Sequence, residues 1–190
     1  MLIGLFGGSF NPVHKGHVSL ARNLLAREHL DEVWFMVSPQ NPLKKQTDLA
    51  DDNDRLNMVR LALENEKGLK ACDYEFHLSR PSFTWNTLEA LRRDYPGDEF
   101  VLLIGADNWC NIDRWARYEE IISNYRIIVY PRDGYSVDTT QLPTTVRMVD
   151  TPLYNVSSTE IRQRLAAGKS VTRLIDKSVA SYITRNRLYF

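Results

Sequence analysis

The sequence is poor in cysteine, has no net charge and contains no long apolar run. Its two cysteines, Cys72 and Cys110, form no C-x-x-C pair and no disulfide framework, which fits a reducing cytosol. Because 24 basic residues balance 24 acidic ones, nothing indicates a nucleic-acid-binding or anionic-membrane surface. No stretch approaches the roughly 20 apolar residues of a membrane span, and glycines and Pro12 interrupt the apolar N-terminus, unlike a signal peptide. We therefore expect a cytoplasmic protein in which any phosphate site is a local cluster of cations.

Apolar runs alternate with segments of helical periodicity along the whole chain. The 190 residues, 43% of them hydrophobic, suit one well-packed domain over 1–190, with a helical C-terminal part from about residue 157. Strands are predicted at 2–6, 32–37, 69–78, 100–104, 126–130 and 146–149. Helices are predicted from residue 16 and at 51–66, 84–94, 115–122, 157–167 and 176–187. This order favours an α/β fold with a doubly wound, mainly parallel sheet that binds its ligand at the carboxyl ends of the strands.

The first strand leads through a glycine turn into a helix, an arrangement typical of a phosphate site. Gly7 and Gly8 let the backbone approach an oxyanion, and free N–H groups at a helix start favour negative charge. His14 and His17 can donate imidazole N–H groups to the same phosphates. Neither G-x-x-x-x-G-K-[ST] nor G-x-G-x-x-G occurs here; residues 8–17 instead read GSFNPVHKGH.

Two other interpretations of the histidines stay open. They could form a metal pair, although no third Asp, Glu, His or Cys ligand is spaced nearby. They could also be ordinary capping and core histidines.

A second phosphate site is predicted near the other end of the chain, in the NVSSTEIR segment. Ser157 and Glu160 have the spacing of a capping box, so a well-capped helix is the plainer alternative. Ser158 and Thr159 add hydroxyls at the positive end of the helix dipole. The guanidinium of Arg162, one turn on, matches phosphate oxygens bidentately.

These motifs resemble the signatures of the nucleotidyltransferase superfamily that carries H-x-G-H and S-S-T-x-I-R. The NPLKK loop, PSFTWNTL, LIGADNW and Trp115 narrow the resemblance to the bacterial nicotinate-nucleotide adenylyltransferases, over nearly the whole chain. Asn11 stands where an acidic residue is more usual, and Leu43 where many members have histidine. The Ser38–Asp54 loop is expected to order when substrate binds.

The resemblance implies a Rossmann-like nucleotidyltransferase fold and the reaction of nicotinate mononucleotide with ATP to give nicotinate adenine dinucleotide and pyrophosphate. It implies catalytic groups at His14, His17 and Arg162. Implied ATP contacts are Gly7, Gly8, Ser9, Phe10, Gly105, Asp107, Ser157, Ser158 and Thr159. Implied mononucleotide contacts are Lys44, Arg55, Thr84 and Trp115. Mg²⁺ is expected on the ATP phosphates, without a protein carboxylate cage.

Three alternative functions also fit parts of these motifs. Another transferase of the superfamily, such as a phosphopantetheine adenylyltransferase, would keep the phosphate motifs but have no use for PSFTWNTL or Trp115. A non-catalytic nucleotide-binding domain should have lost His14, His17 or Arg162, and all three are present. A metal-binding protein using the histidine pair is the third. The sequence leaves open whether the chain forms a homo-oligomer.

Overall fold

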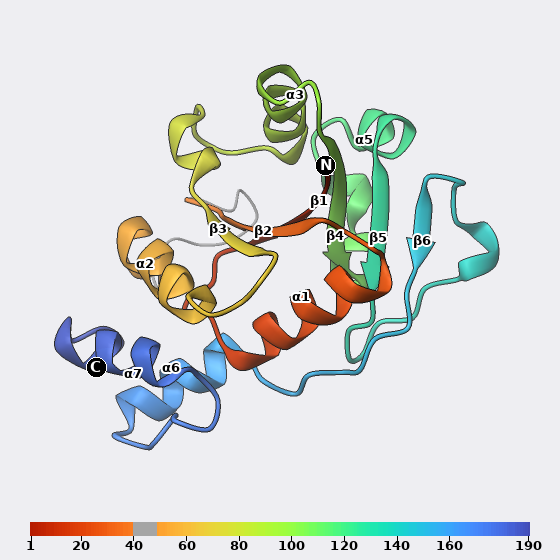
Figure 1. Cartoon of the computed structure of the whole chain (residues 1–190). Coiled ribbons are helices and arrows are strands. Elements are labelled where there is room, and N and C mark those ends of the chain that lie inside the picture. The colour runs from red at the N-terminus through yellow and green to blue at the C-terminus, as the bar shows by residue number, and fades with distance from the viewer. Residues whose placement is uncertain (40–48) are drawn as a thin grey trace.

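The computed structural model describes residues 1–39 and 49–190, and its centre is a six-stranded sheet (Figure 1). The strands follow the order β3-β2-β1-β4-β5-β6, and every neighbouring pair is parallel. Their bounds are β1 Leu2–Gly8, β2 Glu32–Val37, β3 Leu69–Cys72, β4 Glu99–Gly105, β5 Arg126–Tyr130 and β6 Val146–Met148. The predicted doubly wound α/β sheet is confirmed, with its switch point between β1 and β4.

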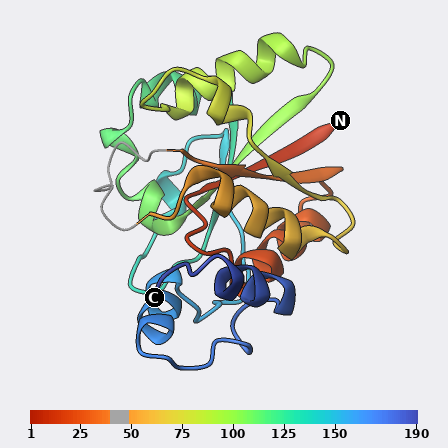
Figure 2. The same ribbon diagram turned by 90° about the vertical axis from the view of Figure 1, so that its left-hand side faces the viewer.

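Helices cover both faces of the sheet. In Figure 2, α3 and α5 lie on one side of the strands, and α1, α2, α6 and α7 lie on the other. The helices are α1 Lys15–Arg27, α2 Asp52–Leu63, α3 Thr84–Asp94, α4 Ala106–Trp109, α5 Tyr118–Asn124, α6 Ser158–Ala166 and α7 Lys177–Arg185. Short 3₁₀ turns are η2 Tyr74–His77, η3 Ile112–Arg114 and η4 Thr139–Gln141.

Alternation along the central strands supplies both halves of the core. On β1, Phe6 packs on the α1 side, while Ile3 and Leu5 pack on the α3 side. On the α1 side, α7 adds Val179 and Ile183 and is hydrogen-bonded to α2 through the hydroxyl of Tyr182. The C-terminal helices therefore join the core of the sheet.

Two predicted elements were wrong at their boundaries. The strand predicted at 69–78 ends at Cys72, because residues 74–77 turn into η2, where Glu75 is buried against α3. The helix predicted at 115–122 begins only at Tyr118, after Arg117 adopts a left-handed backbone with φ 57°. That later start leaves Trp115 outside the helix.

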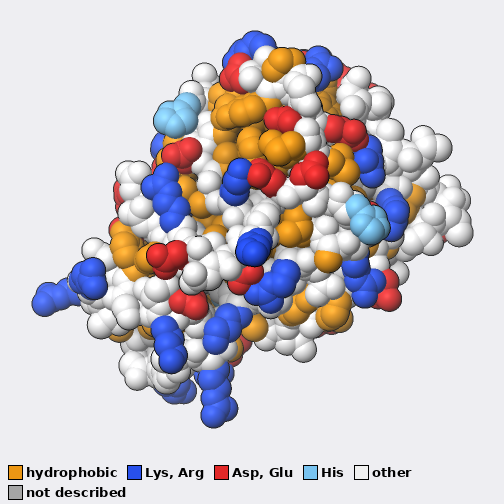
Figure 3. Space-filling view, in the orientation of Figure 1, with side chains coloured by type: hydrophobic (Ala, Val, Ile, Leu, Met, Phe, Trp, Pro, Cys, Tyr) orange, Lys and Arg blue, Asp and Glu red, His pale blue; other side chains and the backbone are white. Residues whose placement is uncertain are grey.

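Charge is unevenly distributed although the net charge is zero. Residues 158–190 hold seven Lys or Arg and two acidic residues, so the rest of the chain is net negative. Figure 3 shows basic side chains spread over the lower part of this face, around α6 and α7, and an apolar and acidic group above them. In the part of the chain that the structure describes, no helix is long and apolar enough to cross a membrane.

Candidate active site

The turn after β1 is built on a buried phenylalanine. Phe10 is 3% exposed, has φ 45° and packs on Phe6 and Phe35 with ring centroids 5.7 and 5.3 Å away. A Cβ at Gly8 would come within 3.0 Å of that ring, so glycine is required there by packing. A Cβ at Gly7 would meet nothing within 4 Å, so the strand end is open to a ligand. Phe10 thus shapes the turn, and its side chain does not face the ligand space.

His14 and His17 hold each other by reciprocal capping at the start of α1. The Nδ1 atom of His14 accepts the main-chain N–H of His17, and the Nδ1 atom of His17 accepts that of His14, both at 3.3 Å. The two rings stack with centroids 3.5 Å apart and 17° between planes. Because each Nδ1 is an acceptor, a neutral imidazole carries its proton on Nε2. The pair therefore offers two Nε2–H donors.

Electrostatics favours the neutral form of His14. Burial, aided by the nearby positive charge of Arg132, lowers the pKa of His14 to about 4. Two stacked imidazolium rings would also repel each other. At neutral pH, His14 is a donor without charge, which suits hydrogen bonding to a phosphate and does not suit proton abstraction.

The start of α6 is joined to the first turn. The Oγ atom of Ser157 accepts the N–H of Glu160 at 3.1 Å, which is the Ser157 half of the expected capping box. The Glu160 carboxylate instead accepts from Arg164 at 2.9 Å. The hydroxyl of Ser158 donates to the carbonyl of Pro12 at 2.9 Å, and Arg162 donates to the carbonyl of Asn11 at 2.8 Å. Two motifs about 150 residues apart in sequence thus form one site. Thr159 is exposed beside them and its Oγ1 accepts from Arg162 at 3.4 Å.

Gly105 and Asp107 lie at the carboxyl end of β4, next to the end of β1. A Cβ at Gly105 would collide with the Asp107 carboxylate and come within 2.9 Å of Arg132. Arg132 Nε lies 3.5 Å from Asp107 Oδ1, which is an ion pair without hydrogen-bond geometry. Sequence reasoning missed Arg132. The sequence feature that could have identified it is its position: Arg132 is a basic residue two positions after a buried strand, at the end of the sheet where ligands bind.

Two cavities flank this turn. One, of about 360 Å³, is lined by both histidines, by Arg132 and by residues 152–157 and Glu160. The other, of about 190 Å³, lies over the α3 face of the sheet and is lined by Gly7, Gly8, Ser9, Thr84 and Trp115. Thr84 and Trp115, two of the implied mononucleotide contacts, therefore line the same cavity. Phe83 and Thr84 begin α3, and among the described residues no side chain caps that helix start.

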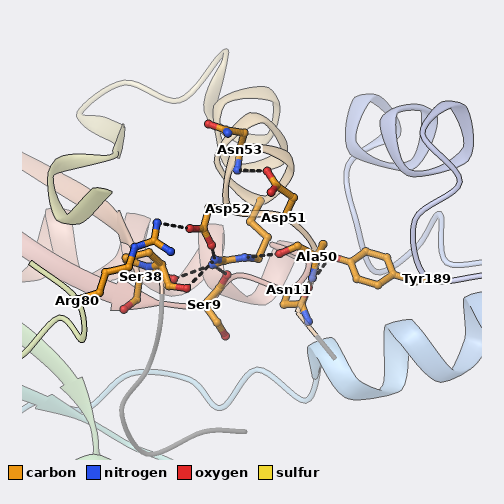
Figure 4. A network of polar contacts seen from close by, with 11 residues as sticks. Ser9, Asn11, Ser38, Ala50, Asp51, Asp52, Asn53, Arg80 and Tyr189 are labelled. Atoms are coloured by element: carbon orange, nitrogen blue, oxygen red, sulfur yellow. Dashed lines mark hydrogen bonds and ion pairs between the residues drawn. The ribbon is translucent and has the colours of Figure 1, made fainter. Parts of the chain in front are cut away.

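The structure does not support phosphate binding by Arg55. Its side chain is completely buried, and its N–H groups donate to the carbonyls of Ala50, Ser9, Ser38 and Pro39 and to the carboxylate of Asp52. Figure 4 shows Ser9, Ser38, Asp52 and Ala50 gathered from three segments around this guanidinium. A guanidinium has five N–H groups, and five acceptors occupy them. Arg55 therefore fixes the backbone beside the site instead of meeting substrate.

Lys44 and the rest of residues 40–48, within the Ser38–Asp54 loop, lie outside the described residues. The metal alternative for the histidine pair finds no support in residues 1–39 and 49–190, where no three His, Cys, Asp or Glu side chains form a group that could hold an ion.

Comparison with known proteins gives consistent results. The sequence model of the cytidylyltransferase-like family matches residues 5–164. A Bacteroides fragilis protein named "Probable nicotinate-nucleotide adenylyltransferase" is 51% identical over 93% of this chain and 88% of its own length. A protein of the same name from Flavobacterium johnsoniae is 40% identical over 100% of this chain and 99% of its own. A Plasmodium falciparum nicotinic acid mononucleotide adenylyltransferase complexed with NaAD superposes with a TM-score of 0.84 at 20% identity, covering 99% of this chain and 97% of that one, which shows a common fold.

Proposed function

Because the chain belongs to the nicotinate-nucleotide adenylyltransferases, within the cytidylyltransferase-like family, we infer that it transfers the adenylyl group of ATP to nicotinate mononucleotide in NAD biosynthesis. The products are nicotinate adenine dinucleotide and pyrophosphate. The observation that carries this function is the pair of cavities on either side of one glycine turn. Adenylyl transfer needs two substrates whose phosphates meet, and the turn lies where two bound nucleotides would meet.

We propose that ATP occupies the larger cavity. Its phosphates would meet the Nε2–H groups of His14 and His17 and the start of α6 at Ser157, Ser158 and Thr159. Gly105 leaves room for the nucleoside, and the Asp107 carboxylate would accept hydrogen bonds from the ribose. The net positive C-terminal segment suits a polyanion at this place.

The mononucleotide then occupies the smaller cavity. Trp115 would stack on the pyridine ring, and the uncapped N–H groups at the start of α3, near Thr84, would take the carboxylate. These N–H groups are donors only. They fit the acceptor-only carboxylate of nicotinate better than an amide, whose NH₂ would face another donor.

Catalysis in this arrangement rests on alignment and charge. The attacking phosphate monoester has a second pKa near 6, so it is already charged at pH 7 and needs no general base. Its oxygen forms a bond to the α-phosphorus of ATP while the bond to the pyrophosphate oxygen breaks. The Nε2–H donors of His14 and His17, with Arg162, would stabilise the charge that moves onto the phosphates.

Mg²⁺ is proposed as a partner of the triphosphate and not as a resident of the protein. The described residues offer no acidic cage, so the ligands of the ion would be phosphate oxygens and water. We also propose that the protein works in the cytoplasm, where its free Cys72 and Cys110 stay reduced. We also propose that residues 1–190 form one domain.

The test is an assay of pyrophosphate release from ATP and Mg²⁺ with nicotinate mononucleotide or phosphopantetheine as acceptor. We expect turnover with the mononucleotide alone. Turnover with phosphopantetheine would assign the chain to another transferase of the superfamily, and turnover with neither acceptor would favour a non-catalytic nucleotide-binding domain.

A further inference from the structure

A buried carboxyl group without a full set of partners forms part of the smaller cavity. Glu75, in η2, is 8% exposed and lines this space. Its Oε1 atom accepts the hydroxyl of Thr87 at 2.9 Å. Its Oε2 atom is buried and has no hydrogen-bond partner among the described residues.

Within residues 1–39 and 49–190, no cation neutralises this carboxylate. No ion pair among the described residues includes Glu75, and burial raises its pKa, opposed only by the hydroxyls of Thr87, Ser38 and Ser82. The last two lie close enough to act electrostatically without completing a hydrogen bond to Oε2. An unpaired buried carboxylate is costly, so a ligand of opposite charge in the cavity would favour its ionised form.

The rest of the cavity indicates what that charge is. Its floor is the apolar surface of Leu5, Met36, Leu88 and Leu102, which suits a flat ring, and Trp115 lies on its wall. The pyridine ring of the mononucleotide is flat and, because its nitrogen carries the ribose, positively charged. It is the one cationic part of a substrate that is otherwise anionic.

We propose that Glu75 is a substrate-binding residue whose carboxylate is the counter-charge of the pyridinium ring. This rests on the proposed function, which places the mononucleotide in this cavity. The N–H groups at the start of α3 bind the carboxylate substituent of the ring, and Glu75 attracts the positively charged ring itself. The site would then select a quaternised pyridine over a neutral ring of the same shape.

Three ligands separate this role from the alternatives, with affinities measured by calorimetry at pH 8 on the intact chain. Nicotinate mononucleotide has a cationic ring and a carboxylate. Nicotinamide mononucleotide has the same cationic ring and an amide. The 5′-phosphate of the benzoate C-riboside has the carboxylate on a neutral ring.

Glu75→Gln keeps the size of the side chain and an acceptor for Thr87 but removes the charge. We expect it to weaken both cationic ligands by about 10- to 100-fold, because an opposite charge within 4–6 Å is worth one to three powers of ten. The neutral-ring ligand should bind the variant as well as it binds wild type, and the KM for ATP should not change. Glu89→Gln, on α3 but outside the cavity lining, is the matched control and should bind like wild type.

Equal weakening of all three ligands would mean that Glu75 only shapes the cavity, and would overturn the proposal. A loss confined to the two carboxylate ligands would mean that Glu75 acts on the ring substituent, which would also overturn it. Turnover of nicotinate mononucleotide by wild type tests the proposed function separately, so either idea can fail without the other.

Discussion

Replacing Arg55 with methionine should cost far more stability than replacing Arg60, on the same helix. Methionine is unbranched and of similar length, so packing is largely kept while all five N–H groups are lost. Asp52 keeps a partner, because Arg80 donates to its other carboxylate oxygen at 2.8 Å. The loss therefore falls on the main-chain carbonyls of Ser9, Ser38, Pro39 and Ala50.

The magnitude follows from those carbonyls. A buried acceptor left without a donor costs about 1–3 kcal/mol, and part of that cost is recovered where water enters. With four such groups, and little additivity between neighbours, we expect Arg55→Met to lower the free energy of unfolding by about 3–5 kcal/mol. Arg60 is exposed, and its ion-pair partner Asp73 is 3.4 Å away. Arg60→Met should therefore change the free energy of unfolding by less than about 0.5 kcal/mol.

Urea unfolding followed by tryptophan fluorescence measures both variants, with similar m-values as the check that the two states are comparable. A loss below about 1 kcal/mol for Arg55→Met would refute the structural role assigned to the guanidinium. If a near-native stability came with a raised KM for the mononucleotide alone, Arg55 would instead be the phosphate ligand that the sequence suggested.

Three further outcomes are expected. His17→Ala should lower kcat by about 10²- to 10³-fold, with His14→Ala and Arg162→Ala similar or milder; unchanged kcat in steady-state assays would exclude the donor role of His17. The pKa of His14 is about 4 in the folded protein and 6.5 in the unfolded chain, so the unfolded chain takes up the proton first as the pH falls. The contribution of neutral His14 to the free energy of unfolding is therefore complete above pH 6.5 and decreases towards pH 4. Between pH 6.5 and pH 4, urea unfolding should show that the free energy of unfolding decreases by up to about 3 kcal/mol more in wild type than in His14→Gln. An equal decrease in both proteins would contradict the lowered pKa of His14. Finally, kcat/KM should be about 10²-fold or more higher for nicotinate mononucleotide than for nicotinamide mononucleotide. A preference for the amide would contradict the proposed carboxylate-binding N–H groups near Thr84.

The first motif was predictable because its information is local. Glycines after an apolar run and two histidines three residues apart lie within one strand, turn and helix. Capping was one of the interpretations left open for them, but the reciprocal hydrogen bonds between the two were not predictable, because histidine is seldom an N-cap residue. It depends on a helix that begins at Lys15, and boundaries are the least certain part of a sequence pattern.

Arg55 shows why other roles escape sequence analysis. An arginine among four aspartates beside a lysine-rich loop has the local signature of a phosphate or surface residue. Its acceptors are main-chain carbonyls, which no side-chain pattern encodes, and they come from residues 9, 38–39 and 50. The position of Glu75 in the site was not predicted for a related reason. The alternating residues 69–78 predict a strand, whereas residues 74–77 form a 3₁₀ turn in which Glu75 contacts Thr87, so tertiary contacts override the strand tendency.

Asn11 connects the two motifs and explains why a departure from the family pattern leaves the site intact. Its Oδ1 atom accepts the N–H of Ala50 at 3.0 Å and the hydroxyl of Tyr189 at 2.7 Å (Figure 4). Its main-chain carbonyl accepts a hydrogen bond from Arg162. Each of these contacts needs an acceptor on Asn11, and a carboxylate would serve as well as an amide oxygen. The first turn, Ala50 near the start of α2 and the C-terminal segment therefore meet at one side chain, and the charge of that side chain is not required for these bonds. A neutral residue there also leaves the positive charge of Arg162 unpaired by an adjacent carboxylate, so that it remains available to a phosphate.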